Sequence, residues 1–118
     1  GPIRVGGDGT PLRSYLYGAD MAWWLWALLA RGAPGGVYNV GSEEALPLAD
    51  LARRIAALES PALPVRIAGT PVPGAAAERY VPSTARIRND LGVAQTVPLV
   101  DALRRMLAWA RAPQEEAR

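Results

Sequence analysis

DMAWWLWALLAR, residues 20–31, is the stretch that decides what kind of fold this chain can adopt. Asp20 is well placed to cap a helix that begins at Met21, while Arg31 and Gly32 give that helix a basic last turn and a glycine at which to stop. At about 100° per residue, the three tryptophans and the leucines cover nearly the whole circumference of the helix. A helix without a polar face is normally buried, so we expect other elements to enclose this one.

The segments on either side of this helix predict short strands. Ile3 to Val5 is a β-type run, and Gly6 to Pro11 is a strong turn signal directly after it. Leu12 to Tyr17 alternates and predicts an extended segment, and Val37 to Val40 predicts a further strand beyond the helix.

The second half of the chain predicts two amphipathic helices. Pro47 suits the first turn of one of them, whose apolar face consists of Leu48, Leu51, Ala52, Ile55 and Leu58. The last helix starts near Pro98 and is expected to present Leu99, Leu103, Met106, Leu107 and Ala110 on one face. Between them we expect a strand at Val65 to Ile67, an irregular loop over residues 69–77, and a short helix capped by Ser83 and closed by Gly92.

The resulting order is β, loop, α, β, α, β, loop, short α, α, which predicts a small mixed α/β fold with few short strands. Three short strands cannot cover a helix that carries tryptophans on all sides. We therefore expect something outside this chain to bury residues 21–31.

The residue types that are missing exclude several classes of chemistry. Among 118 residues there is no cysteine and no histidine, and all 13 basic residues are arginine. These absences exclude disulfides, thiol nucleophiles, an imidazole base, lysine Schiff bases and a Tyr-Lys catalytic pair. The 11 carboxylates are scattered, with Glu43 and Glu44 interpreted as solvated loop charges. We expect neither a catalytic residue nor a metal site in this chain.

Charge and hydropathy limit the classes of partner that we expect this chain to bind. The net charge is +2 and the arginines are spread along the chain, so we do not expect nucleic-acid binding. Residues 21–30 are too few to span a bilayer, and no leader-like segment precedes them. We therefore expect a cytoplasmic protein without membrane contact.

Three residues are candidates for gripping an anion. Arg13 and Tyr15 alternate along an extended run and so face the same way, which suits either ordinary surface or a bidentate phosphate contact with a nearby hydroxyl. Arg79 follows the 69–77 loop, and it is either a surface residue or one that swings over a bound anion. The run Gly7 to Leu12 begins like a G-x-G-x-x-G loop but fails at its sixth position, so we interpret it as a turn.

Four stretches, in order, resemble the C-terminal part of the extended short-chain dehydrogenase/reductases, the nucleotide-sugar epimerases and dehydratases. The stretches are GDGTPLRSYLY at residues 7–17, YNVGS at 38–42, LADLARRI at 48–55, and the segment from Arg79 through Pro82 to NDLG at 89–92. The resemblance covers residues 2–111. Two departures from the family pattern are Pro47, in place of a Ser/Thr cap, and Gly18-Ala19, in place of Val-Asp.

The resemblance implies a role for the candidate residues. Arg13, Tyr15 and Arg79 correspond to family positions that contact the diphosphate and sugar of the substrate, and the family's Rossmann domain, its cofactor loop and its Tyr-x-x-x-Lys pair have no counterpart here. We expect residues 1–112 to be the substrate-binding part, residues 113–118 to be a disordered tail, and NAD(P) to be held by the parent protein's N-terminal domain rather than by this chain.

The predicted function is therefore to hold a nucleotide-diphosphate sugar for an NAD(P)-dependent epimerase or 4,6-dehydratase, with no activity from this chain alone. Two alternatives stay open from the sequence. One is a stand-alone, non-catalytic nucleotide-sugar binding module. The other is an interaction domain that uses the Trp-rich helix, through which we also expect self-association.

Overall fold

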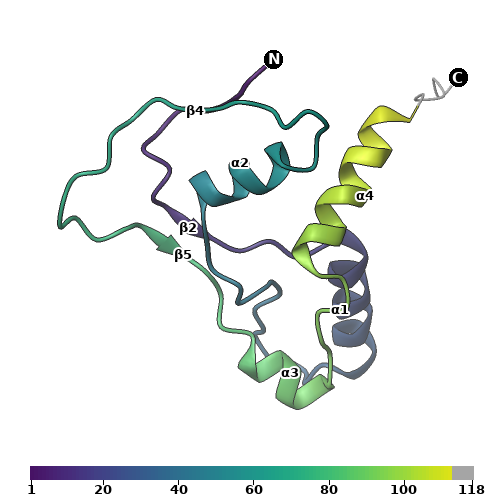
Figure 1. The fold of residues 1–118 in the computed structure, drawn as a ribbon. Helices are drawn as coiled ribbons and strands as arrows, with labels where there is room; N and C mark the ends of the chain where they lie inside the picture. The colour runs from purple at the N-terminus through teal and green to yellow at the C-terminus, as the bar shows by residue number, and fades with distance from the viewer. Residues whose placement is uncertain (113–118) are drawn as a thin grey trace, which may run out of the picture.

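Four helices and five very short strands make up the computed structural model, which describes residues 1–112 (Figure 1). The predicted tail at 113–118 lies outside the described residues. The helices are α1 (Gly18–Arg31), α2 (Leu48–Ala56), α3 (Ala85–Leu91) and α4 (Leu99–Arg111). The strands are β1 (Ile3–Val5), β2 (Leu12–Arg13), β3 (Leu46–Pro47), β4 (Val65–Ile67) and β5 (Arg79–Tyr80).

The strands form two small sheets. In one, β1 pairs in parallel with β4, with Arg4 level with Arg66. In the other, β2 lies in the middle, antiparallel to β3 and parallel to β5. The mixed α/β class with few short strands is therefore as predicted. The strands at residues 3–5 and 65–67 are confirmed, as is the turn after β1, where the Asp8 carboxylate accepts hydrogen bonds from the Thr10 amide and hydroxyl.

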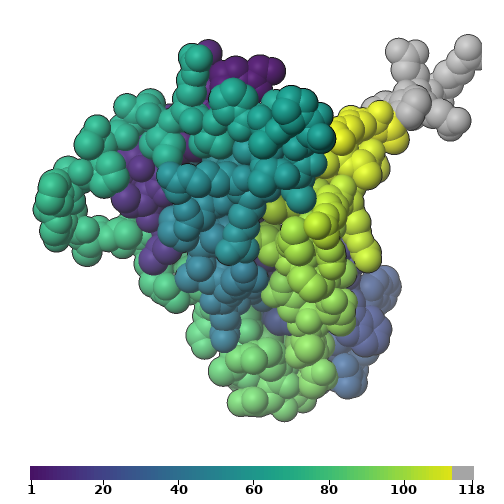
Figure 2. Space-filling model, in the orientation of Figure 1, coloured from purple at the N-terminus to yellow at the C-terminus, as the bar shows by residue number. Residues whose placement is uncertain are grey.

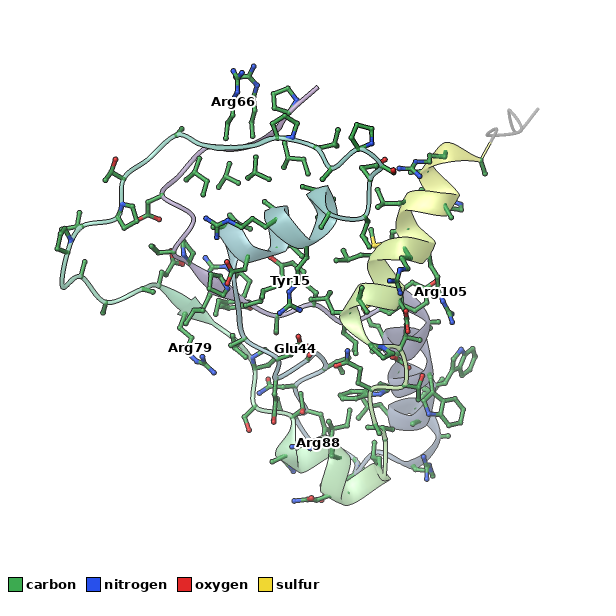
Figure 3. All side chains as sticks on the ribbon, viewed as in Figure 1. Tyr15, Glu44, Arg66, Arg79, Arg88 and Arg105 are labelled. Carbon is green, nitrogen blue, oxygen red and sulfur yellow. The ribbon has the colours of Figure 1, made fainter. Side chains whose placement is uncertain are left out.

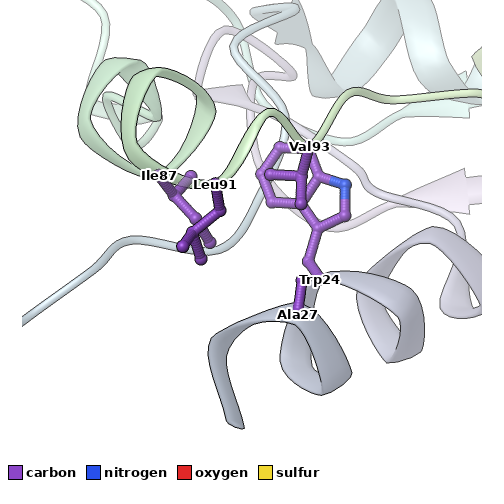
Figure 4. Packing of buried hydrophobic residues seen from close by; sticks show 5 residues of the cluster. All are labelled: Trp24, Ala27, Ile87, Leu91 and Val93. Atoms are coloured by element: carbon purple, nitrogen blue, oxygen red, sulfur yellow. The ribbon is translucent and has the colours of Figure 1, made fainter. Parts of the chain in front are cut away.

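Two separate hydrophobic clusters hold the helices. In the first, Trp24 and Ala27 of α1 pack against Ile87, Leu91 and Val93 at α3 (Figure 4). In the second, Leu99 and Leu103 of α4 pack with Leu46 of β3 and with apolar residues of α2. The predicted apolar face of α2 is thus confirmed, whereas that of α4 is confirmed at Leu99 and Leu103 but wrong at Met106 and Ala110, which are exposed.

The chain is spread out rather than compact. Its radius of gyration is 17.3 Å and its extents are 49 × 47 × 25 Å, whereas a compact domain of this length has a radius of about 13.5 Å. The whole chain exposes 8244 Å², compared with about 6,200 Å² for a folded monomer of its mass. Residues 71–80 are all exposed and project as a lobe from the body (Figures 1 and 2).

Helix α1 is largely exposed, as expected from a chain with too few strands to cover it. Its indole Trp24 is 1% exposed, but Trp23, Trp26 and Leu29 are 58%, 67% and 77% exposed. Residues 1–112 therefore enclose only one side of this apolar helix.

Several predicted details are wrong. Asp20 does not cap α1, because the helix begins at Gly18, three residues before the predicted start, and Tyr17 occupies the N-cap without a side-chain cap bond. Only Leu12–Arg13 of the extended run pairs as a strand, and residues 37–40 form none. Ser83 does not cap α3 either, since the N-cap residue is Thr84.

Candidate anion-binding cleft

A cleft of about 610 Å³ lies where three segments that are distant in sequence meet. Residues 13–16 begin at the last residue of β2, residues 39–42 come from the loop before β3, and residues 79–82 begin at β5, with Met21 of α1 completing the lining. All three predicted ligand residues, Arg13, Tyr15 and Arg79, contribute to this lining.

Arg13 is held in place by its own strand and by the exposed lobe. One guanidinium nitrogen donates to the Leu12 carbonyl oxygen at 2.9 Å, and the other donates to Glu78 Oε1 at 2.8 Å. The Arg13 side chain is 30% exposed while that of Glu78 is 72% exposed. A bound phosphate would therefore meet an oriented guanidinium that already has one exposed carboxylate partner.

Arg79 lies on the strand next to Arg13 but not level with it. The parallel register pairs Leu12 with Arg79 and Arg13 with Tyr80. Because paired residues on neighbouring strands face the same way and successive residues face opposite ways, Arg13 shares its face with Tyr80. Figure 3 shows the Arg79 side chain extending away from β5 into open space. The structure thus brings both arginines to one cleft, while a joint grip on a single anion stays a prediction that requires Arg79 to bend around the end of β5.

Tyr15 has a second role in addition to lining the cleft. Its ring packs partly against the cluster of Leu46, Leu99 and Leu103, so it connects the cleft to the core near α4. Tyr80 is a cleft residue that the sequence analysis missed, and it is 77% exposed. The sequence offered one signal for Tyr80, its position next to Arg79 in an extended run. Its placement beside Arg13 could not be predicted, because the strand register depends on residues far apart in sequence.

The wall at residues 39–42 lies close against the opposite wall. A side chain at Gly41 would place its Cβ 2.7 Å from Pro82 Cγ, so only glycine permits this approach. The Asn39 side-chain amide donates to the Ser83 carbonyl oxygen at 3.1 Å. The buried hydroxyl of Ser42 accepts from the Glu44 amide at 3.2 Å and fixes the turn that follows.

Glu43 is an exposed loop charge, as the sequence suggests, with its side chain 41% exposed, but it is also bonded to a distant segment. Its carboxylate accepts hydrogen bonds from the Thr84 amide at 2.6 Å and the Thr84 hydroxyl at 3.0 Å, and it pairs with Arg88 at 3.1 Å. The bonds from Thr84, first the amide and then the hydroxyl, outweigh desolvation and, with the charge of Arg88, hold the pKa of Glu43 below its ordinary value of 4.5. Glu43 therefore fixes the N-cap residue of α3 from a distant segment.

Asp20 also connects distant segments. It is 3% exposed, and it accepts hydrogen bonds from the Thr96 amide, the Thr96 hydroxyl and the Val97 amide. Burial alone would raise the pKa of Asp20, but these bonds and the charge of Arg105 lower it below its ordinary value of 3.8. Instead of capping α1, Asp20 fixes the segment that leads into α4.

The described residues offer little else to a cofactor. Within residues 1–112 no three acidic side chains gather as a metal site, and none of the helices there is long and apolar enough to cross a bilayer. The glycine turn at residues 6–11 leads into strand β2 rather than onto a helix N-terminus, so it does not fit the pyrophosphate of a dinucleotide.

Several known proteins resemble this chain. A model of the NAD dependent epimerase/dehydratase family matches residues 1–41. The dTDP-glucose 4,6-dehydratase of Neisseria gonorrhoeae is 29% identical over 119 residues, which cover 92% of this chain and 34% of that protein. The enzyme WbmF of Bordetella bronchiseptica, solved in complex with NAD+ and UDP, is 29% identical with a TM-score of 0.78 over 94% of this chain and 32% of its own.

A further structure shows the fold alone. The dTDP-glucose 4,6-dehydratase of Bacillus anthracis in complex with NAD has a TM-score of 0.79 at 18% identity, over 97% of this chain and 36% of its own. The chain thus spans about a third of the length of these proteins. The resemblance to NAD-dependent nucleotide-sugar dehydratases and epimerases, and the fold class that it implied, are confirmed.

Proposed function

We propose that this chain, which resembles about a third of an NAD-dependent nucleotide-sugar dehydratase or epimerase, is the part that holds the nucleoside diphosphate of the substrate. The observation that carries the proposal is the single cleft lined by Arg13, Tyr15 and Arg79 from adjacent segments. The UDP bound in WbmF, which matches over 94% of this chain, supports the same ligand class.

The chemistry of the cleft suits a diphosphate. Guanidinium groups stay charged at any physiological pH and form paired hydrogen bonds with phosphate oxygens. Arg13 is already oriented by the Leu12 carbonyl, so little side-chain freedom is lost when it binds. The exposed Arg79 and the hydroxyl of Tyr15 would add donors from the neighbouring strand and from the segment after β2.

The redox step belongs to the rest of the parent enzyme in this proposal. A nicotinamide cofactor, when bound there, would supply the hydride chemistry. The residues of this chain orient the diphosphate and exclude water from one side of it. Because the glycine turn does not fit a dinucleotide, we assign no cofactor contact to the described residues.

We also propose where the rest of the parent docks. Met21, Leu25 and Leu29 recur every four residues along α1, are 46%, 49% and 77% exposed, and start at the edge of the cleft. A Rossmann domain that covers this row would close the open side of the cleft. The cytoplasmic location of such an enzyme stays a prediction.

The test is a titration of the 118-residue chain with UDP, followed by NMR shifts. Arg13→Ala and Arg79→Ala should each weaken binding by about 1–3 kcal/mol, the cost of losing hydrogen bonds to a charged group. Arg104→Ala is the matched control, because it removes the same charge from α4, where Arg104 pairs with Asp101. If neither cleft variant changes the titration relative to the control, the cleft is not the diphosphate site.

A second candidate function is favoured by one observation. Trp23 and Trp26 are 58% and 67% exposed, which suits an interaction surface used for self-association or for a protein partner. A stand-alone binding module or interaction domain would need no Rossmann domain. The reading frame around these residues in the parent gene shows whether such a domain is encoded.

A further inference from the structure

We infer that Glu43 is a positioning residue of the cleft, which sets the separation of its two walls at residues 39–42 and 79–82. The inference rests on the proposed function, since it concerns the same diphosphate cleft. Glu43 itself does not line the cleft, so it would act on the ligand only through the walls.

Both oxygens of the Glu43 carboxylate accept hydrogen bonds from the segment that follows the opposite wall. Oε1 accepts from the amide and the hydroxyl of Thr84, and Oε2 accepts from the Arg88 guanidinium. Thr84 lies two residues beyond the cleft wall and is 3% exposed. Glu43, which follows the wall at residues 39–42, is therefore fixed at Thr84 and at Arg88 to the segment that follows the wall at residues 79–82.

The walls have few other connections. Across residues 1–112 no backbone hydrogen bond joins residues 39–43 to residues 79–84. Besides Glu43, the Asn39 amide reaches the Ser83 carbonyl, and Gly41 contacts Pro82. The bonds to Glu43 are charge-assisted and hence roughly twice as strong as the neutral bond from Asn39.

The position of Arg79 depends on this link. The segment from β5 to α3 includes Pro82, which restricts its backbone, and residues 71–80 on its other side are fully exposed. The exposed residues therefore add little support beyond the two-residue pairing of β5 with β2, and Thr84 is the fixed point on the other side of the wall. Arg13, by contrast, is held by β2 and should not respond to Glu43.

The experiment compares Glu43→Ala with Glu44→Ala in the 118-residue chain, titrated with UDP and also melted thermally. Glu44 is the matched control, because it is adjacent, carries the same charge and pairs with Arg54 instead. We expect Glu43→Ala to weaken UDP binding about five- to twentyfold and Glu44→Ala to change it by less than about twofold.

A double-mutant cycle separates positioning from simple loss of stability. If Glu43 acts through Arg79, Glu43→Ala in an Arg79→Ala background should weaken binding by less than about twofold more, whereas in an Arg13→Ala background its full effect should remain. The drop in melting temperature should be the same in all three backgrounds. An equal binding loss in every background would overturn the inference and leave Glu43 as a general stabilising residue.

Three further results keep the test decisive. If Glu43→Ala does not fold, Glu43→Gln retains one oxygen for Thr84 and loses the charge that binds Arg88, so a smaller loss with the same dependence on Arg79 is expected. If Arg13→Ala and Arg79→Ala weaken binding but neither Glu43 variant does, the inference fails while the proposed function stands. If none of the four variants has an effect, the proposed function itself fails.

Discussion

Replacement of Asp20 by asparagine tests how a buried carboxylate connects α1 to the segment that leads into α4. Asp20 lies in the first turn of α1, and Oδ2 accepts from the amides of Thr96 and Val97 at 3.0 and 2.9 Å. Oδ1 accepts from the Thr96 hydroxyl at 2.5 Å. Asparagine has the same shape, so the substitution changes charge and hydrogen-bond polarity with little change in packing.

The magnitude follows from the three bonds. The asparagine oxygen can still accept from both amides, and its NH₂ group can donate to the Thr96 hydroxyl, which rotates to accept. No buried group loses its partner, but three bonds to a charge become neutral, which costs roughly 1 kcal/mol each and is partly offset because a charge is no longer buried. We expect a loss of about 2 kcal/mol in the free energy of unfolding, or about 8 °C in melting temperature for a chain of this length.

The assay is thermal unfolding by circular dichroism from pH 7 to pH 3. The pKa of Asp20 is lowered in the folded chain. Its stabilising contribution is therefore fully present above the ordinary value of 3.8 and disappears as the pH falls through the folded pKa. The difference between wild type and Asp20→Asn should be constant at neutral pH and should narrow below pH 3.8.

The control is Asp101→Asn on α4, whose carboxylate pairs with Arg104 and whose side chain is 46% exposed. This variant should cost less than about 0.5 kcal/mol. Equal melting temperatures for wild type and Asp20→Asn at pH 7, or a difference that does not narrow in acid, would refute the account of Asp20.

Two other results are expected. Glu78→Gln should tighten UDP binding about two- to fivefold, because the Arg13 guanidinium no longer has a competing carboxylate partner; weaker binding than in a Glu44→Gln control would instead make Glu78 a residue that orients Arg13. We expect the wild-type chain to self-associate with rising concentration in sedimentation experiments, and a chain that stays monomeric would contradict the role of this surface. Trp23→Arg combined with Trp26→Arg should abolish this self-association and leave UDP binding unchanged, since neither indole lines the cleft.

The sequence predicts those elements whose signal is local. The 2-residue and 3.6-residue periodicities identify β1, β4, α2 and α4 to within a few residues, and Gly92 ends α3 in the left-handed conformation expected of a closing glycine. Arg13 and Tyr15 are recognisable because they alternate in one short run. Each of these inferences needs only residues that are neighbours along the chain.

The features that the sequence does not predict depend on partners far away. Residues 37–40 have the composition of a strand, but the Val37 carbonyl accepts from the Arg86 side chain and the Asn39 side chain donates to the Ser83 carbonyl, so they bond to residues around α3 rather than to another strand. Asp20 resembles a helix cap until Thr96, 76 residues later, supplies its donors. Glu43 resembles a surface charge until Thr84 and Arg88 are brought to it. In each case the sequence suggests a role for the side chain within its own helix or loop. Its hydrogen bonds instead connect it to a distant segment, and nothing in the nearby sequence indicates that partner.

The open side of the cleft and the uncovered face of α1 form one continuous surface. Met21 lines the cleft with Asn39 and Val40, while Leu25 and Leu29 line the next hollow with Val37 and Tyr38. The same extended segment thus forms one wall of both depressions, and the apolar row of α1 runs along both. A neighbour that buries this row must also lie over the cleft, so it would exclude water from the arginines and strengthen their interaction with a diphosphate. Covering of the helix and binding of the ligand should therefore favour each other, because each removes solvent from the surface that the other uses.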